Sequence, residues 1–515
     1  MNATKNVPGT APGIRRLVAA AALTGLFAAP AAGQDIPDRP EELVFPDFLF
    51  ETPDGGDVHH RLANGVPVVI VEDHTLPLVR LAVSLRIGSF LDPEDQVGLA
   101  SLTATMMREG GAGDRTPEEL DERIEFLAAR ISVSAQDTEA RASLRTITPV
   151  FEESLELFFD VLMQPRFDEG RFAVRKENVR EDLRQRNDDA DNLLAREWDF
   201  LLYGRDSYLG RRMTVGHLDA IAKDDLAEFH RRAWRPEHMV WSVSGDVDTA
   251  EILAVLEERL GAWPEAPDAF DVPWPPPHDA PAPAPGIYHV EKDIPQGKVR
   301  IGNLAPRWDS WDNPERAAIQ VMDHILGASG FTSRIMQRVR SDEGLAYGAG
   351  GRFGFNPLGP SAYSMGYQSK SSTVALAGAI ALEEVRRIRD EPVSPEELDL
   401  AKRSLVDSFP RRFESAQARA GIFANDAFLR RDHGYWIRWR EQIEAVTADD
   451  VMAAARKYLR PEEMVMLVVG VWEDIAPGDP EGRADMTDLL NGEVTHLPGR
   501  DPLTLEALSP EGQER

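Results

Sequence analysis

The sequence predicts an α+β protein made of two tandem homologous domains, each a mixed β-sheet layered with α-helices. Three observations lead to this fold class: an internal repeat, a proline-rich segment between its two copies, and strands that follow one another directly along the chain. Strands that are neighbours in sequence are typical of α+β layers rather than doubly wound sheets. The chain of 515 residues, 42% of them hydrophobic, is large enough to bury two cores.

The internal repeat relates Ala220–Val247 to Ala445–Trp472 at an offset of 225 residues. Each copy predicts an acidic helix start, a short amphipathic helix, an Arg-Pro-Glu turn and an apolar strand that ends at glycine. The matching positions are Asp224–Asp225 with Asp449–Asp450, Arg235–Glu237 with Arg460–Glu462, and Gly245 with Gly470.

The repeat divides the chain into two domains, which we expect over residues 55–262 and 287–475. Between them, residues 263–286 are so rich in proline that they predict an extended linker, because proline is excluded from helix interiors and central strands. Residues 476–515 are polar and acidic, and we expect a mostly loose tail there.

The N-terminus predicts an export signal over residues 1–33. Lys5, Arg15 and Arg16 precede an apolar stretch, Leu17–Ala29, and small residues follow up to a cleavage site expected near Gly33. The alternative is an uncleaved membrane anchor, although the apolar run is short for one. An exported protein would be periplasmic in a Gram-negative bacterium.

Charge and cysteine content exclude several classes of function. The net charge is −30, and removal of residues 1–33 takes away three positive charges and brings it to −33. This charge argues against nucleic acid or anionic lipid as partners and permits basic peptides. The chain has no cysteine, so it has neither disulfides nor thiol chemistry, and after the signal no run is apolar enough to span a membrane.

Within the domains, periodicity and capping residues predict the following elements. The first domain has strands over 66–71, 78–87, 131–135 and 140–147, with helices that begin at Val97 and after the capping residue Thr116, and further helices over 150–163 and 171–186. The second has a strand over 297–304 and helices over 314–326 and 332–341.

The segment Gly98–Gly111 has the shape of an inverted zinc motif, H-x-x-E-H, without its chemistry. In that motif two histidines one helical turn apart bind Zn²⁺, and the glutamate activates the zinc-bound water. Here the histidine positions hold Ser101 and Thr105, and the glutamate position holds Ala104. Hydroxyl groups are poor zinc ligands beside imidazole, and a methyl group cannot accept a proton.

The chain resembles the pitrilysin/insulinase family of zinc peptidases, especially the two-domain subunits like those of mitochondrial processing peptidase. The resemblance covers roughly residues 55–475. It rests on the opening Leu62–Asp73, on Ile87–Ser89 followed by Gly98–Ala100, and on Arg235–Glu237 with Ser244–Asp246.

The resemblance implies a third zinc ligand, a glutamate on a later helix. Glu181, 76 residues past Thr105, is similar in position, with Glu177 as a nearby supporting acid. One carboxylate cannot hold zinc, which needs three or four protein ligands. The alternative is that Glu181 is an ordinary helix carboxylate.

The resemblance also implies an arginine and a tyrosine, seven residues apart, that contact the substrate near the scissile bond. Arg340 and Tyr347 match this pattern, and Ser333-Arg334 precede them in the expected place. Arginine supplies a permanent cation and tyrosine a hydroxyl donor for a developing oxyanion. The alternative is that Arg340 ends a surface helix and Tyr347 belongs to a strand core.

Two other groups of residues, glycines and histidines, each allow more than one role. Glycines at 327 and 330, and again from 348 to 354, are explained equally by turns or bulges and by close approach of a peptide backbone. None of the 11 histidines forms a zinc-binding pair with a glutamate, and we expect surface or packing roles for them.

These features favour a non-catalytic, substrate-positioning subunit of an exported heterodimeric zinc peptidase. The resemblance implies that a related partner with an intact H-x-x-E-H would hold the zinc, and that this chain binds none alone. The alternative is a peptide-binding or scaffold protein derived from a peptidase, without proteolytic activity.

Overall fold

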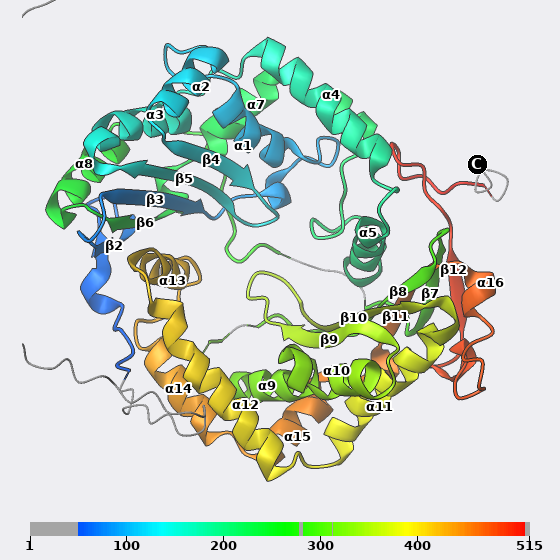
Figure 1. Ribbon diagram of the computed structural model, residues 1–515. Helices are drawn as coiled ribbons and strands as arrows, with labels where there is room; N and C mark the ends of the chain where they lie inside the picture. Colours follow the sequence, from blue (N-terminus) through cyan, green and yellow to red (C-terminus); the bar gives the residue numbers. More distant parts are fainter. Residues whose placement is uncertain (1–49, 278–281, 309, 312, 510–515) are drawn as a thin grey trace, which may run out of the picture. The chain divides into compact units, whose positions relative to one another are not determined.

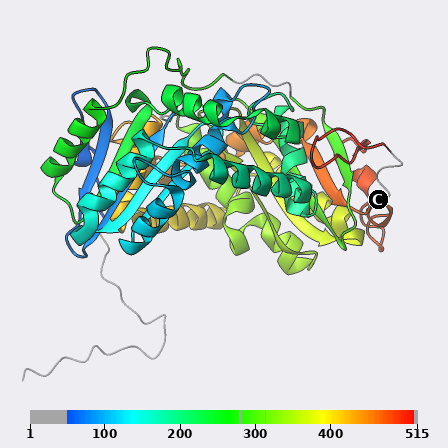
Figure 2. The same ribbon diagram turned by 90° about the horizontal axis from the view of Figure 1, so that it is seen from above.

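The computed structural model describes residues 50–277, 282–308, 310–311 and 313–509 (Figure 1). The predicted signal, residues 1–33, lies outside the described residues. The strands form two separate six-stranded sheets (Figures 1 and 2). Both sheets mix parallel and antiparallel pairs and carry helices, so the α+β prediction with two domains is confirmed.

The first sheet belongs to the N-terminal half of the chain. Its strand order is β1 (His59–Arg61), β2 (Pro67–Glu72), β6 (Met239–Gly245), β3 (Leu78–Leu85), β5 (Ala140–Ile147) and β4 (Arg130–Ala135). One face is buried under a helix layer of α1 (Leu99–Glu109), α2 (Pro117–Phe126), α3 (Phe151–Met163), α4 (Glu169–Gln185), α6 (Val215–Ala220), α7 (Lys223–Ala233) and α8 (Thr249–Gly261).

The second sheet repeats this arrangement in the C-terminal half. Its order is β12 (Val494–Leu497), β7 (Gly286–Glu291), β11 (Val465–Gly470), β8 (Gln296–Ala305), β10 (Ser361–Lys370) and β9 (Ala346–Gly354). The helices of this half are α9 (Glu315–Asp323), α10 (Arg334–Met336), α11 (Val374–Asp390), α12 (Pro395–Ser408), α14 (Tyr435–Ala445), α15 (Ala448–Tyr458) and α16 (Trp472–Ile475).

The internal repeat has the same place in both sheets. β6 lies parallel to β2 and antiparallel to β3, and β11 lies parallel to β7 and antiparallel to β8. In each copy the Arg-Pro-Glu turn forms a short 3₁₀ segment between the preceding helix and the strand. The predicted helix–turn–strand unit is therefore confirmed in both copies.

Local sequence signals explain where several elements begin. The Thr116 hydroxyl accepts a hydrogen bond from the Glu119 backbone N–H (3.3 Å), and the Glu119 carboxylate accepts one from the Thr116 N–H (2.9 Å). This capping box starts α2 as predicted. In β3 and β5, buried and less buried residues alternate, so each strand directs one apolar side toward the helix layer.

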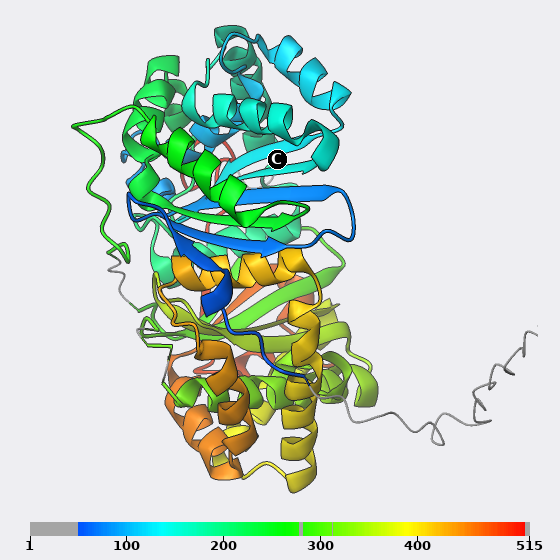
Figure 3. The same ribbon diagram turned by 90° about the vertical axis from the view of Figure 1, so that its left-hand side faces the viewer.

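Two helices cross from one half of the chain to the other, which the sequence does not predict. Helix α5 (Ala190–Tyr203) packs on β8 and β11 of the second sheet, and α13 (Ala416–Phe428) packs on β2 and β6 of the first. Figure 3 shows α13, in yellow-orange, running beside the strands of the first sheet. Because α5 covers its second face, β11 is buried at every position.

The C-terminal segment is more ordered than its composition suggests, which corrects our expectation of a loose tail over its described part. β12 pairs parallel to β7, and Leu489 and Leu505 are buried. Arg500 forms an ion pair with the buried carboxylate of Glu197 on α5 (3.1 Å). A few apolar anchors and one buried partner fix this segment, although its average composition is polar.

Two helices of the second half end earlier than predicted. The helix expected over 314–326 is α-helical only to Asp323 and continues as the π-helix η6 (His324–Ala328). The helix expected over 332–341 is α-helical only over α10 and continues as the π-helix η8 (Gln337–Asp342). The wider π turns redirect the chain toward β9, which both segments contact. Among the described residues, no helix has both the length and the apolar character to cross a membrane.

The crossing of α5 predicts a large stability effect at a residue far from any site. Leu202 on α5 is fully buried, so Leu202→Ala should lower the free energy of unfolding by about 2–5 kcal/mol. The same substitution at the half-exposed Leu400 of α12 should change it by less than about 1 kcal/mol. Denaturant unfolding followed by tryptophan fluorescence measures both, and equal effects would show that α5 does not stabilise the fold.

Candidate functional site

The helix that carries the degenerate zinc motif is firmly attached at its N-terminus. Gly98 has φ +102°, a conformation that favours glycine, and its N–H donates to Asp92 (2.7 Å). The Ala100 N–H donates to the other carboxylate oxygen of Asp92 (2.8 Å). Burial raises the pKa of Asp92 to about 6. The carboxylate of Asp92 therefore fixes the N-terminus of α1, and no metal ligand is needed for this.

The three motif positions on α1 have different surroundings. Ser101 is exposed and Thr105 is half-buried one turn later, so the two residues share a helix face. The Thr105 hydroxyl donates to the backbone carbonyl of Ser101 (3.0 Å). Ala104, at the position of the general base, is fully buried in the core. A helix-internal hydroxyl bond and a core methyl group replace the groups that would bind and activate zinc-bound water.

Glu181 lies on α4, which contacts α1. Its carboxylate accepts hydrogen bonds from Arg184 (2.9 Å) and Gln185 (2.7 Å), and the Arg184 guanidinium also reaches Glu177 (3.4 Å). The bond from Arg184, followed by that from Gln185, lowers the pKa of Glu181. The carboxylate is therefore occupied by neighbours on its own helix.

The residues at this site do not fit a zinc ion. Zinc needs three or four nitrogen, sulfur or carboxylate ligands, and here two of the positions are hydroxyls and the third is held by an arginine. Over the described ranges, no group of three or more His, Cys, Asp or Glu side chains is arranged to hold a metal.

The predicted pair Arg340 and Tyr347 does come together. Arg340 is on η8 and Tyr347 near the start of the edge strand β9, and the guanidinium carbon lies 4.6 Å from the centroid of the tyrosine ring. The same guanidinium lies 4.5 Å from the ring of Phe331. Both rings are unusually open for aromatic side chains, with 87% of Tyr347 and 65% of Phe331 exposed. Sequence reasoning missed Phe331, whose only signal is its place beside Gly330.

The chemistry of this arrangement suits contact with a peptide. Cation–π contacts with two aromatic rings hold the guanidinium of Arg340 in place. Among the described residues it has no ion pair or side-chain hydrogen bond, so its N–H donors are available to a carbonyl. The exposure of Tyr347 contradicts the alternative that this residue belongs to a strand core.

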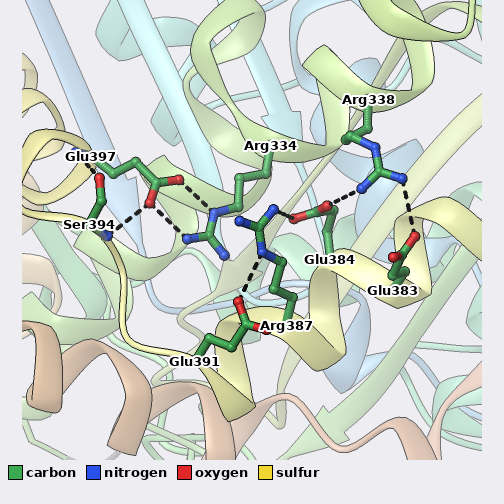
Figure 4. A network of polar contacts seen from close by, with 8 residues as sticks. All are labelled: Arg334, Arg338, Glu383, Glu384, Arg387, Glu391, Ser394 and Glu397. Atoms are coloured by element: carbon green, nitrogen blue, oxygen red, sulfur yellow. Dashed lines mark hydrogen bonds and ion pairs between the residues drawn. The ribbon is translucent and has the colours of Figure 1, made fainter.

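A network of arginine–glutamate pairs holds the segment in front of Arg340 (Figure 4). Arg334 forms a two-pronged ion pair with Glu397 at the start of α12 (2.7 and 2.8 Å), which lowers the pKa of Glu397. Arg338 on η8 donates to Glu384 of α11 (2.7 Å), which is fully buried. These pairs attach α10 to α12 and the π-helical segment η8 to α11, so Arg334 has a structural role here.

The glycines around the pair serve the internal packing of the chain. A Cβ at Gly350 would lie 2.5 Å from the carbonyl oxygen of Gly327, and one at Gly327 would lie 2.4 Å from the nitrogen of Gly351. The backbone of η6 therefore lies directly against β9, at a distance only glycine permits. Close approach by the chain's own backbone explains these three glycines, whereas a Cβ at Gly348 would meet only the tip of Met336, at 4.0 Å.

Several histidines have packing partners. His230 is partly buried and bonds the Leu162 carbonyl (2.8 Å). The ring centroids of His59 and His433, which come from opposite halves of the chain, lie 4.2 Å apart. Burial lowers the pKa of His59 to about 4, and the charge of His433 is the second cause. His289 bonds both the Gly470 carbonyl (2.9 Å) and the ring of His496 (3.0 Å).

Comparison with known proteins relates both halves to one family. The family model described as Insulinase (Peptidase family M16) matches residues 67–201, and the model described as Peptidase M16 inactive domain matches residues 220–405. The chain is 26% identical over 366 residues to the non-peptidase homolog YmxG of Helicobacter pylori. This alignment covers 71% of this chain and 82% of that protein. It is 27% identical over 316 residues to an uncharacterized zinc protease of Mycobacterium bovis, covering 59% of this chain and 69% of that one.

Solved structures share the architecture. A peptidase M16 inactive domain from Pseudomonas fluorescens aligns with a TM-score of 0.71 and 25% identity, over 80% of this chain and 98% of that one. A protease from Helicobacter pylori aligns with a TM-score of 0.69 and 18% identity, also over 80% and 98%, and shows the fold alone.

The zinc chemistry of α1 can be tested by metal analysis. The purified chain, incubated with zinc and desalted, should retain far less than one equivalent, because it offers no set of three ligands. The double variant Ser101→His/Thr105→His should retain more, since it places two imidazoles one turn apart on α1. Zinc near one equivalent in the unmodified chain, together with peptidase activity that a chelator removes, would contradict this assignment.

Proposed function

Because the chain belongs to the insulinase family of peptidases (family M16), as an inactive member that lacks the zinc-binding residues, we propose that it is the substrate-positioning subunit of an exported heterodimeric zinc metallopeptidase. A related two-domain partner with an intact H-x-x-E-H holds the zinc and carries out peptide hydrolysis. This chain contributes Arg340 and Tyr347 and helps to bind the peptide as an added β-strand.

The proposal rests on a contrast between the zinc-motif positions on α1, which lack metal-binding side chains, and the Arg340–Tyr347 pair, which is present. The positions Ser101, Ala104 and Thr105 lack side chains that can bind zinc or activate water. Arg340 and Tyr347, in contrast, contact each other, and the ring of Tyr347 is exposed to solvent. A cation and a hydroxyl of this kind stabilise negative charge on a carbonyl oxygen and orient a peptide. They do not themselves supply a nucleophile, so the proposed catalyst is on another chain.

Export is part of the same proposal and rests on the sequence of residues 1–33, which lie outside the described part. A positive segment, an apolar stretch and small residues before the first acid support export, and the periplasm if the source is a Gram-negative bacterium. N-terminal sequencing of the native protein tests this, with a mature end expected near Gln34.

A second candidate function is a peptide-binding or scaffold protein that joins no proteolytic complex. The similarity to a relative named as a non-peptidase homolog favours it. Purification of the native protein distinguishes the two. A one-to-one complex with a chain that contains H-x-x-E-H supports the subunit proposal, and isolation as a homodimer or in an unrelated assembly supports the scaffold.

In the active complex, Arg340→Ala and Tyr347→Phe should each lower kcat/KM for peptide hydrolysis by about tenfold or more. A tenfold loss corresponds to about 1.4 kcal/mol of transition-state stabilisation.

Matched controls are Arg403→Ala, whose guanidinium pairs with Asp399 on the surface of α12, and Tyr288→Phe, whose hydroxyl donates to the Ala284 carbonyl. Both controls should leave kcat/KM within about twofold, a change of roughly 0.4 kcal/mol. Unchanged kinetics in the Arg340 and Tyr347 variants would remove the role proposed for the pair.

A further inference from the structure

The face of the first sheet that points away from its helix layer is rich in arginine and serine on three adjacent strands. Apart from Leu78 and Ile147, which pair at one end, the residues on this face are Arg80, Ala82 and Ser84 (β3), Arg141, Ser143 and Arg145 (β5), and Arg130, Ser132 and Ser134 (β4). Helix α13 packs over the neighbouring strands β2 and β6. We call the nine residues on β3, β5 and β4 the arginine–serine face.

Three arginines of this face form one row across the sheet. Arg80 lies directly opposite Arg145, and Arg145 lies directly opposite Arg130. Because neighbouring strands are about 4.8 Å apart, three cationic side chains project from adjacent positions. Like charges directly opposite one another destabilise a sheet. The fold therefore carries a cost here that a neutral side chain would remove.

In the part of the chain that the structure describes, no acidic side chain pairs with this row. Arg130, Arg141 and Arg145 are exposed, and among the described residues their side chains form no hydrogen bond or ion pair. Arg80 donates to the side-chain oxygen of Gln417 on α13, which is a neutral partner. Other exposed arginines do lie beside carboxylates, as Arg231 does beside Asp268 (2.7 Å). The charge of the row is therefore available to a ligand.

The arginine–serine face is the floor of a groove of about 1020 Å³, with α13 as one wall. The 21 residues that line the groove include five arginines, one of them Arg412 from the second half, and six serines, but no aspartate or glutamate. This absence is informative because 87 of the 515 residues of the chain are acidic. Serine hydroxyls also supply donors between the arginines, and those of Ser132 and Ser143 lie 2.8 Å apart.

We infer that the arginine–serine face binds an acidic segment of a polypeptide and thereby selects peptides rich in aspartate or glutamate. The inference rests on the proposed peptide-binding function and adds the class of peptide. A guanidinium donates two parallel hydrogen bonds to a carboxylate, and this match is strongest where the arginine has no other partner. The local charge thus reverses the preference for basic ligands that the net charge of −30 suggests.

A polypeptide fits this face better than a nucleic acid does. The net negative charge of the chain repels a long polyphosphate wherever it leaves the groove. Single-stranded nucleic acid is typically bound by exposed aromatic rings, and Trp436, the only aromatic residue among those lining the groove, is buried.

The edge of the sheet supports the same ligand. β4 is the last strand of the sheet and pairs only with β5 among the described strands. An extended peptide added beside β4 would place every second side chain on the arginine–serine face, next to Arg130, Ser132 and Ser134. Helix α1, with Ser101 and Thr105, packs against the same strand. A carboxylate on such a peptide would then lie opposite Arg130.

Peptide binding to the full chain tests the inference. Three fluorescein-labelled peptides of twelve residues, alternating alanine with glutamate, glutamine or lysine, would be titrated with the protein at low salt, with fluorescence anisotropy as the measurement. We expect the glutamate peptide to bind at least about tenfold more tightly than the glutamine peptide, and the difference to shrink as salt rises.

The variant Arg130→Ser/Arg141→Ser/Arg145→Ser should lose this preference. Its circular dichroism should stay at the unmodified values and its melting temperature should not fall, because all three side chains are exposed and the repulsion between Arg130 and Arg145 is removed. The control Arg231→Ser/Arg386→Ser/Arg403→Ser makes the same change of net charge outside the groove and should keep the preference. A single-stranded oligothymidylate of similar charge should bind more weakly than the glutamate peptide.

Three results would overturn the inference: equal affinity for the three peptides, an unchanged preference in the groove variant, or tighter binding of the oligothymidylate. Equal affinity would leave the proposed positioning function intact. Failure of that function would instead appear as unchanged turnover in the Arg340→Ala complex, whatever the charge preference of the chain.

Discussion

The exchange of one helix between the two halves of the chain is the contact on which the rest of the structure depends. Helix α5 leaves the first half and buries Trp198 and Leu202 against the second sheet, and α13 crosses in the other direction. Each fully buried large apolar side chain contributes about 1.5–3 kcal/mol, so α5 alone supplies a substantial part of a typical folding free energy. The two halves therefore form one folded body, although they descend from a repeat.

This exchange also determines which surfaces remain for function. α13 covers β2 and β6 but leaves β3, β5 and β4 as the floor of a groove, and the side chain of Arg80 on this floor bonds directly to α13. On the second sheet α5 covers β8 and β11 and leaves the edge strand β9, where Tyr347 is exposed. The residues proposed to contact a peptide thus lie on the strands that the crossing helices leave open or, in the case of Arg340, on the segment η8 beside such a strand.

The degenerate metal site shows how a fold can lose chemistry without losing stability. Ala104 adds a methyl group to the core, and the Thr105 hydroxyl is satisfied by a carbonyl of its own helix. Neither substitution leaves a buried polar group without a partner, which would cost about 1–3 kcal/mol. Arg340, by contrast, is supported by a network that includes the buried carboxylate of Glu384.

The sequence by itself determined the fold class, the repeat and most element positions, because periodicity, capping residues and Arg-Pro-Glu turns act over a few neighbouring residues. It also identified Ser101, Ala104 and Thr105 as a site without metal chemistry, and its resemblance to a known family implied the pairing of Arg340 with Tyr347. Those patterns need no knowledge of distant contacts.

Only the tertiary structure decided the features that join residues far apart in the chain. The crossing of α5 and α13, the packing of Gly327 on Gly350, and the ordered tail held by Arg500 and Glu197 all link distant segments. The row of Arg80, Arg145 and Arg130 is invisible in the sequence, where 65 residues separate the first two and acids lie nearby on the chain. Strand register places the three side by side, and the three strands that carry them contain no acidic residue. A net charge is a sum over the whole surface, whereas a ligand meets only the charges that the fold gathers at one place.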